Sequence, residues 1–202
     1  MSGFSNKKKA AIYSFLTLVY IGIPVLILAG LINFDYKFYA LTIGAIVTYL
    51  FCRWMGLSNK ELGITLIGAK KSMLHILPLT IVLAVAGAVL WFAGFSRISP
   101  NENWYFFIFY IFISSPVQEF LYRGVLEAVM EHSNFSFIAK MIFSSLLYSF
   151  VHVIYRDMLT LVLTFAIGLI WYFCYQKEKN LIGVSISHAV LGVVTIVAGI
   201  IN

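Results

Sequence analysis

Four ionisable side chains in the apolar second half of the chain have the types and spacing needed for acid–base chemistry. Glu119 and Arg123 are four residues apart, so they share one face of a helix and can form an ion pair. His152 and His188 follow in later apolar runs, and imidazole transfers protons near neutral pH. The set predicts a functional site. A purely structural ion pair that joins two helices is the alternative interpretation of Glu119 and Arg123.

The same residues allow a metal hypothesis. Glu119, His152 and His188 could form a His₂Glu set of the kind found in catalytic zinc sites. The chain has no H-E-x-x-H helix and no other closely spaced group of ligands. We therefore expect no metal ion and no other cofactor.

The composition is that of a membrane protein. Of 202 residues, 61% are hydrophobic and 11% are charged, whereas soluble domains have about 45–50% and about 25%. An ordinary soluble domain, a disordered chain and a nucleic-acid-binding protein are excluded. The net charge of +6 comes from Lys and Arg residues at the ends of apolar runs, where they meet anionic lipid. Most of the chain is expected inside the bilayer.

The apolar runs must position these side chains. We expect residues 1–202 to form one all-α domain, a polytopic transmembrane bundle of about seven helices, with six to eight allowed by the length. The runs cover residues 10–32, 38–54, 72–95, 104 onward, 137–152, 158–175 and 181–200. The connector 58–71 is partly apolar and is expected to lie along the membrane interface.

The fourth run contains a pattern typical of a helix start. Ser115, Pro116 and Gln118 match an N-cap, a first-turn proline and a capping-box glutamine. The pattern predicts a helix from Pro116 to about Glu131. It leaves open whether the segment from Trp104 is one long helix or two pieces broken at the proline.

The polar side chains are expected to converge. If the helix that carries Glu119 and the helix that ends at His152 are antiparallel neighbours, the two side chains lie at the same level. His188 can reach that level from the last helix. An ionisable group inside the membrane costs about 2.5–3.5 kcal/mol on insertion scales, so a cluster of them predicts function.

The basic residues predict an orientation. Ten of the 14 Lys and Arg residues can be placed on one side of the membrane and three on the other, with Arg123 inside. The larger group includes the N-terminal Lys7, Lys8 and Lys9, so the N-terminus is expected to be cytoplasmic.

Three short motifs follow one another along the chain. They read QEFLYRG (118–124), YSFVH (148–152) and HAVLG (188–192). In this order and at these separations they resemble the CPBP family of intramembrane endopeptidases, which includes CAAX proteases and the bacteriocin-processing, Abi-like proteins. The family pattern is EExxxR, FxxxH and HxxxN. The resemblance covers residues 114–192.

The resemblance implies roles for the matching residues. In the family, the first Glu of the pair and the His of the second motif activate a water that attacks the scissile carbonyl inside the membrane. Here His152 matches that His, and His188 matches one donor to the oxyanion. Glu119 matches the second Glu, and Arg123 matches the Arg that orients the carboxylates. Further residues are expected to line the site: Gln118, Tyr122, Tyr148 and Gly192.

Two departures from the family pattern bear on activity. Gln118 stands where the family has the catalytic Glu, and an amide cannot act as a general base. Gly192 stands where the family has the Asn of the oxyanion site, and Tyr148 replaces a Phe. Glu119 could act as the base with His152, and a water or a backbone N–H could replace the Asn. Alternatively the protein is not a protease. The double loss favours weak or absent proteolysis.

Two functions therefore remain open. The first is a membrane-embedded endopeptidase acting on a peptide or membrane protein. The second is a non-catalytic protein of the same fold that binds or scaffolds a partner protein, peptide or lipid. A transporter is disfavoured because the sequence shows no inverted repeat and no pair of broken helices. The expected partners are the lipid bilayer and a peptide or membrane protein, with no nucleic acid. The resemblance favours a bacterial cytoplasmic membrane, and the oligomeric state is not predicted.

Overall fold

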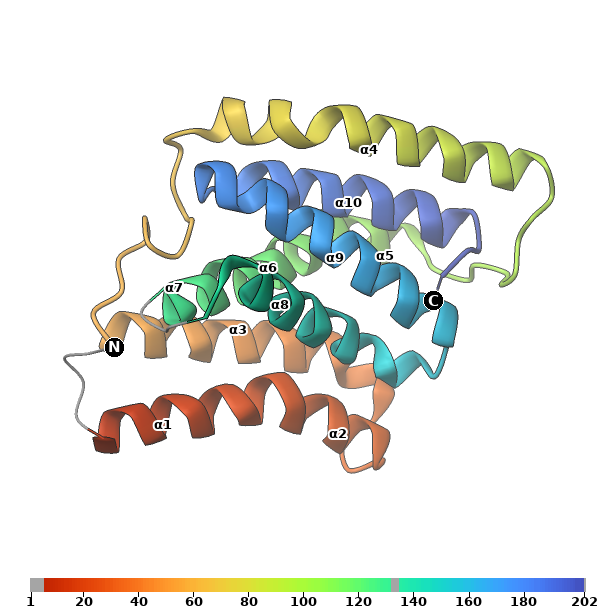
Figure 1. Ribbon diagram of the computed structural model, residues 1–202. Coiled ribbons are helices and arrows are strands. Elements are labelled where there is room, and N and C mark those ends of the chain that lie inside the picture. The colour runs from red at the N-terminus through yellow and green to blue at the C-terminus, as the bar shows by residue number, and fades with distance from the viewer. Residues whose placement is uncertain (1–5, 132–134, 202) are drawn as a thin grey trace.

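The computed structural model describes residues 6–131 and 135–201, and all regular structure in these ranges is helical (Figure 1). This confirms the prediction of an all-α bundle of about seven helices. The elements are α1 (Asn6–Thr17), η1 (Leu18–Gly22), α2 (Ile23–Leu28), η2 (Phe34–Tyr36), α3 (Lys37–Trp54), α4 (Ala69–Phe92), α5 (Trp104–Phe109), η3 (Tyr110–Ser114), α6 (Ser115–Glu119), η4 (Phe120–Val125), α7 (Leu126–Met130), α8 (Phe137–Val151), η5 (His152–Tyr155), α9 (Met158–Glu178) and α10 (Leu181–Val197).

The helices have the length and surface of membrane spans. Five described segments are long and apolar enough to cross a bilayer: Ala11–Leu28, Ala69–Phe92, Trp104–Met130, Phe137–Tyr155 and Met158–Glu178. α10 is a shorter apolar helix. Large apolar side chains face outward along these spans, such as Phe92 on α4 and Phe112 on the fourth. An apolar exterior of this extent is suited to lipid rather than water.

The fourth span is continuous through Pro116, so the prediction of a helix start there is wrong. The helix begins at Trp104, where the side chain of Asn103 accepts a hydrogen bond from the Phe106 N–H at 3.0 Å. Ser115, the expected N-cap, has helical dihedral angles and lies within the helix. The wider π-helical turn η3 precedes the proline, and the Ser115 hydroxyl donates to the Tyr110 carbonyl at 2.9 Å. Such a turn and a neighbouring hydroxyl accommodate proline within a membrane helix.

The Trp104–Met130 helix lies inside the bundle, between α3, α8 and α10. α10 also packs along α4, and α8 packs along α9 (Figure 1). The connector after α3 folds back over this bundle: the Leu181 N–H donates to the Gly63 carbonyl, and Asn180 Nδ2 donates to the Thr65 carbonyl at 2.6 Å. Leu62 of the connector is fully buried, next to Gly124.

The opposite end of the bundle is joined by an ion pair between two loops. Arg97 Nη2 lies 2.9 Å from Asp157 Oδ1, and Asp157 also caps α9 by accepting from the Thr160 N–H. The hydrogen bond from Arg97, followed by that from Thr160, holds the pKa of the Asp157 carboxyl well below its usual value. These contacts tie the loop after α4 to the start of α9.

A glycine on α10 sets the distance to α4. A Cβ atom at Gly183 would overlap the backbone carbonyl of Ser72, whose hydroxyl accepts from the Gly183 N–H at 3.2 Å. Small residues allow close approach of helices in membranes. The contact holds the start of α10, and with it His188 one and a half turns onward, against α4.

Replacing Gly183 by Ala is expected to lower the free energy of unfolding by about 1–3 kcal/mol, the usual effect of overpacking against a rigid neighbour. Unfolding in mixed micelles by a denaturing detergent would measure it. Gly44→Ala on α3 is the matched control, because its new Cβ would lie 3.6 Å from Ile23 Cδ1 in ordinary contact. Equal stabilities of the two variants would show that the α4–α10 contact is not tight.

Candidate active site

Glu119 and His188 meet in the interior of the bundle. Glu119 lies on α6 within the fourth span, and His188 lies on α10. His188 Nδ1 is 2.7 Å from Glu119 Oε1, and both side chains are almost fully buried. Because a carboxylate accepts hydrogen bonds and does not donate them, the imidazole proton is on Nδ1. In its neutral form the ring then has a lone pair on Nε2.

Tyr148 extends this chain of polar groups. Its hydroxyl is 3.3 Å from His188 Nε2 and donates to the lone pair of the neutral ring. Trp171 of α9 stacks on His188, with ring centroids 4.6 Å apart and an angle of 18° between the planes. The imidazole is thus held on both nitrogens and on one face.

Arg123 neutralises the buried carboxylate. Its Nε lies 3.2 Å from Glu119 Oε2, one helical turn away, and neither side chain is exposed. Arg123 Nη2 also donates to the Gly168 carbonyl at 3.3 Å, and the guanidinium lies over the Tyr148 ring at 4.4 Å. The predicted pairing of these two residues is present. Glu119 Oε1 is thus hydrogen-bonded to His188, whereas Oε2 lies at ion-pair distance from Arg123 without a hydrogen bond.

His152 is the more accessible of the two histidines. It follows the end of α8, where it opens the short turn η5, and it is only partly buried. Its Nδ1 lies 2.8 Å from the Tyr148 carbonyl, which fixes the proton on Nδ1 and leaves a lone pair on Nε2. The hydrogen bonds of Glu119 go to His188 and not to His152. The two parts of the site are linked through Tyr148, whose ring centroid is 5.0 Å from that of His152.

Gln118 is held next to the buried pair. Its Nε2 donates to the Ser114 hydroxyl at 3.0 Å, while its Oε1 is buried and has no hydrogen-bond partner. An unpaired buried acceptor costs about 1–3 kcal/mol. It is suited to accept a hydrogen bond from a water or from a substrate N–H.

Tyr122 and Gly192 occupy different surroundings. Tyr122 packs edge-on against Tyr148 at 5.5 Å and against Tyr20 at 5.3 Å, so it supports the Tyr148 ring from behind. Gly192 of α10 faces Tyr110, and a Cβ atom there would overlap the Tyr110 hydroxyl. The space that a side chain at 192 would fill is thus taken by a tyrosine from the fourth span.

Several contributors were missed by reasoning on the sequence. Trp171 stacks on His188 and donates from Nε1 to the Ser187 hydroxyl at 2.9 Å. Thr80 Oγ1 of α4 lies 2.8 Å from Ser187 Oγ. Nothing in the spacing of Trp171 or Thr80 along the sequence indicates that they belong to the site. Ser187 alone carries a signal, because it precedes a motif histidine and is polar in an apolar run.

The arrangement gives no support to the metal hypothesis. Within residues 6–131 and 135–201, no three side chains of His, Cys, Asp or Glu are grouped so that they could hold a metal ion. His188 Nδ1 and Glu119 Oε1 are bonded to each other, and His152 uses its Nδ1 on a backbone carbonyl.

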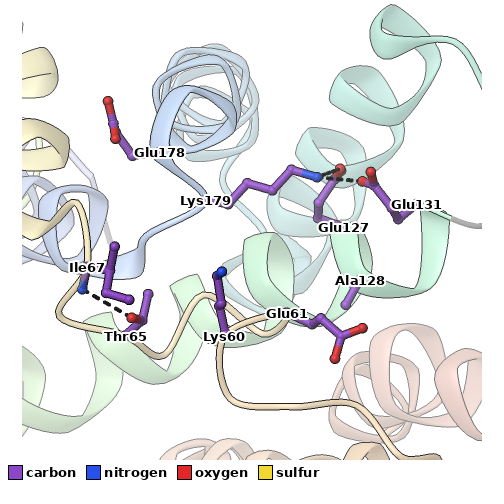
Figure 2. A pocket seen from close by; sticks show the side chains of 9 residues that line it. All are labelled: Lys60, Glu61, Thr65, Ile67, Glu127, Ala128, Glu131, Glu178 and Lys179. Atoms are coloured by element: carbon purple, nitrogen blue, oxygen red, sulfur yellow. Dashed lines mark hydrogen bonds and ion pairs between the residues drawn. The ribbon is translucent and has the colours of Figure 1, made fainter.

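A separate group of charges lies at the end of the bundle where α7 and α9 terminate (Figure 2). Lys179 Nζ lies 2.6 Å from Glu131 Oε2 and 3.5 Å from Glu127 Oε1. The hydrogen-bonding interaction with Glu127, followed by the hydrogen bond from Lys179, lowers the pKa of Glu131 to about 2. A cavity of about 390 Å³ opens beside these charges and is lined by Lys60, Glu61, Thr65, Ile67, Glu127, Ala128, Glu131, Glu178 and Lys179. Neither Glu119 nor the two histidines belong to its lining.

Comparison with known proteins gives one match. The family model described as type II CAAX prenyl endopeptidase Rce1-like matches residues 100–194, which include all the residues of the site described above apart from Thr80 and Tyr20. No curated protein and no solved structure matches the chain. The match confirms the resemblance found in the three motifs.

Proposed function

Because residues 100–194 belong to the type II CAAX prenyl endopeptidase Rce1-like family, we propose that this membrane protein is an endopeptidase that cleaves a peptide or membrane protein within or next to the bilayer. The observation that carries the proposal is the arrangement of His152, Tyr148, His188 and Glu119 along one connected set of contacts inside the membrane spans. Burying such a set of polar groups in the membrane costs free energy, and its presence therefore points to a function.

His152 is the residue best placed to act as the base. Its Nε2 lone pair is unused, and the Tyr148 carbonyl fixes the tautomer. Nε2 takes a proton from a water molecule, and the water oxygen forms a bond to the scissile carbonyl carbon while the carbonyl oxygen becomes negative. When this tetrahedral intermediate collapses, the C–N bond breaks and the proton passes to the leaving amine.

Glu119 has a different role in this mechanism. Its Oε1 accepts a hydrogen bond from His188 and its Oε2 faces the Arg123 guanidinium at ion-pair distance, so its proposed role is to orient the imidazole rather than to activate water. Gln118 contributes an acceptor but no base. The enzyme is therefore slow compared with a relative that carries a carboxylate at position 118.

The alternative is a non-catalytic protein of the same fold that binds a partner protein, peptide or lipid. The observation in its favour is that Glu119 contacts both Arg123 and His188. A carboxylate that already neutralises Arg123 and bonds His188 has the geometry of a structural connection between helices.

The proposed placement in the membrane follows from the basic residues. One end of the bundle, where α3 and α9 end and α8 begins, carries Arg53, Lys140, Lys177 and Lys179, and the other end carries Lys37, Arg97 and Arg156. The excess of positive charge marks the cytoplasmic side. The N-terminus is then cytoplasmic, in a bacterial cytoplasmic membrane, and α10 ends on the opposite side.

Cleavage of fluorogenic apolar peptides by the full chain in liposomes tests the proposal. His152→Ala is expected to lower the rate by about 10²-fold or more, because a positioned general base contributes that much. His75→Ala is the matched control: His75 lies at the start of α4, 3.7 Å from Glu178 and outside the site. Cleavage that survives His152→Ala would overturn the assignment of the base. A wild type that cleaves no peptide would favour the non-catalytic alternative.

A further inference from the structure

Tyr110 places a hydroxyl group in the site from the part of the fourth span that precedes the first motif. It lies at the start of η3, near the beginning of the fourth span, and is nearly buried. A Cβ atom at Gly192 would overlap its hydroxyl, and the adjacent ring carbons would also be in contact. The absence of a side chain at position 192 is thus matched by the presence of a phenol from position 110.

The Tyr110 hydroxyl faces the same part of the site as His188. Gly192 is one helical turn beyond His188, so both positions lie on the same face of α10. The Tyr110 ring is edge-on to the imidazole, with centroids 5.9 Å apart. A group bound against His188 on this face meets the Tyr110 phenol.

The neutral imidazole cannot supply the needed hydrogen bond. Its Nδ1–H donates to the Glu119 carboxylate, and its Nε2 accepts from the Tyr148 hydroxyl. Peptide hydrolysis places negative charge on the carbonyl oxygen, and preorganised donors at that oxygen lower the barrier. The site therefore needs a donor other than His188.

We propose that the Tyr110 hydroxyl is an oxyanion donor of this site, and this inference rests on the proposed endopeptidase function. When water attacks the substrate, the carbonyl oxygen that the Tyr110 hydroxyl would meet becomes an oxyanion. An oxyanion is the stronger acceptor, because hydrogen bonds to charged groups are about twice as strong as those between neutral groups. The same donor therefore favours the tetrahedral intermediate over the substrate.

Tyr110→Phe removes only the hydroxyl. With fluorogenic peptides it is expected to lower kcat by about 10²–10³-fold, as loss of one oxyanion donor does, while KM is unchanged. Tyr105→Phe is the matched control, because Tyr105 lies on the same helix with 64% of its surface exposed. The double variant Tyr110→Ala, Gly192→Asn exchanges the phenol for an amide in the vacated space, and it is expected to cleave faster than Tyr110→Ala alone.

A second measurement separates this inference from the proposed function. A peptide with a phosphinate in place of the scissile amide carries a tetrahedral anion, and its binding needs no cleavage. Tyr110→Phe is expected to weaken binding of the phosphinate by the same factor as kcat and to leave binding of the unmodified peptide unchanged.

The possible outcomes differ for the two proposals. Cleavage by wild type that is unaltered in Tyr110→Phe overturns the role of Tyr110 and leaves the endopeptidase function standing. Tyr110-dependent binding of the phosphinate without any cleavage overturns the function and supports the donor. A wild type that neither cleaves the peptides nor binds the phosphinate overturns both. Unfolding in mixed micelles checks that Tyr110→Phe is folded.

Discussion

Replacing Gln118 by Glu is expected to raise the rate of peptide cleavage by about 10²-fold or more. General bases contribute about 10²–10⁴-fold, and the amide at this position cannot act as one. The side chain is already placed for the role: it is buried beside Glu119, and its Oε1 has no partner to lose. The substitution exchanges the amide nitrogen that donates to Ser114 for a second carboxylate oxygen, to which the Ser114 hydroxyl can donate instead.

The measurement is the initial rate over a range of pH, for wild type and Gln118→Glu in the same liposomes. Gln118→Met is the matched control, since it has similar volume and no basic atom, and we expect it to give no gain. A rate equal to or below that of wild type in Gln118→Glu would show that the base was not lost at this position. If neither wild type nor Gln118→Glu cleaves a peptide, the site is non-catalytic.

Removing the charge of Glu119 is expected to cost about 3–5 kcal/mol of unfolding free energy. The structure leaves Arg123 with no other carboxylate within ion-pair distance among the described residues, and its side chain has no exposed surface. Breaking a buried pair from one side strands the remaining charge in a low dielectric medium. Glu119→Gln should therefore unfold at a much lower concentration of denaturing detergent than the wild type.

Two further variants make this result interpretable. Glu131→Gln makes the same substitution in an exposed pair, where Lys179 lies 2.6 Å away, and we expect a change of about 1 kcal/mol or less. Adding Arg123→Met to Glu119→Gln removes the stranded charge and should recover part of the stability. If Glu119→Gln and Glu131→Gln have equal effects, the Glu119–Arg123 pair is not buried as described.

The fold class and the family could be predicted from the sequence because both depend on local sequence patterns. Seven apolar runs follow from composition and length, and three motifs follow from their order. The Glu119–Arg123 contact follows from a spacing of four residues on a helix. The run of Ser115, Pro116 and Gln118 was misleading, since its helix-start pattern sits in the middle of a span that a π-helical turn keeps continuous.

The arrangement of the site could not be predicted in the same way. Composition and spacing predicted that two histidines lie near Glu119. They did not predict that His188 hydrogen-bonds to Glu119 or that His152 is linked to the site through Tyr148. They also gave no reason to connect Tyr110 with Gly192, which are 82 positions apart. These contacts depend on the rotation and depth of each helix in the bundle, and close packing at residues such as Gly183 and Gly124 sets both. A single sequence records which side chains are present on each helix, whereas the packing of all the helices together fixes which of them meet.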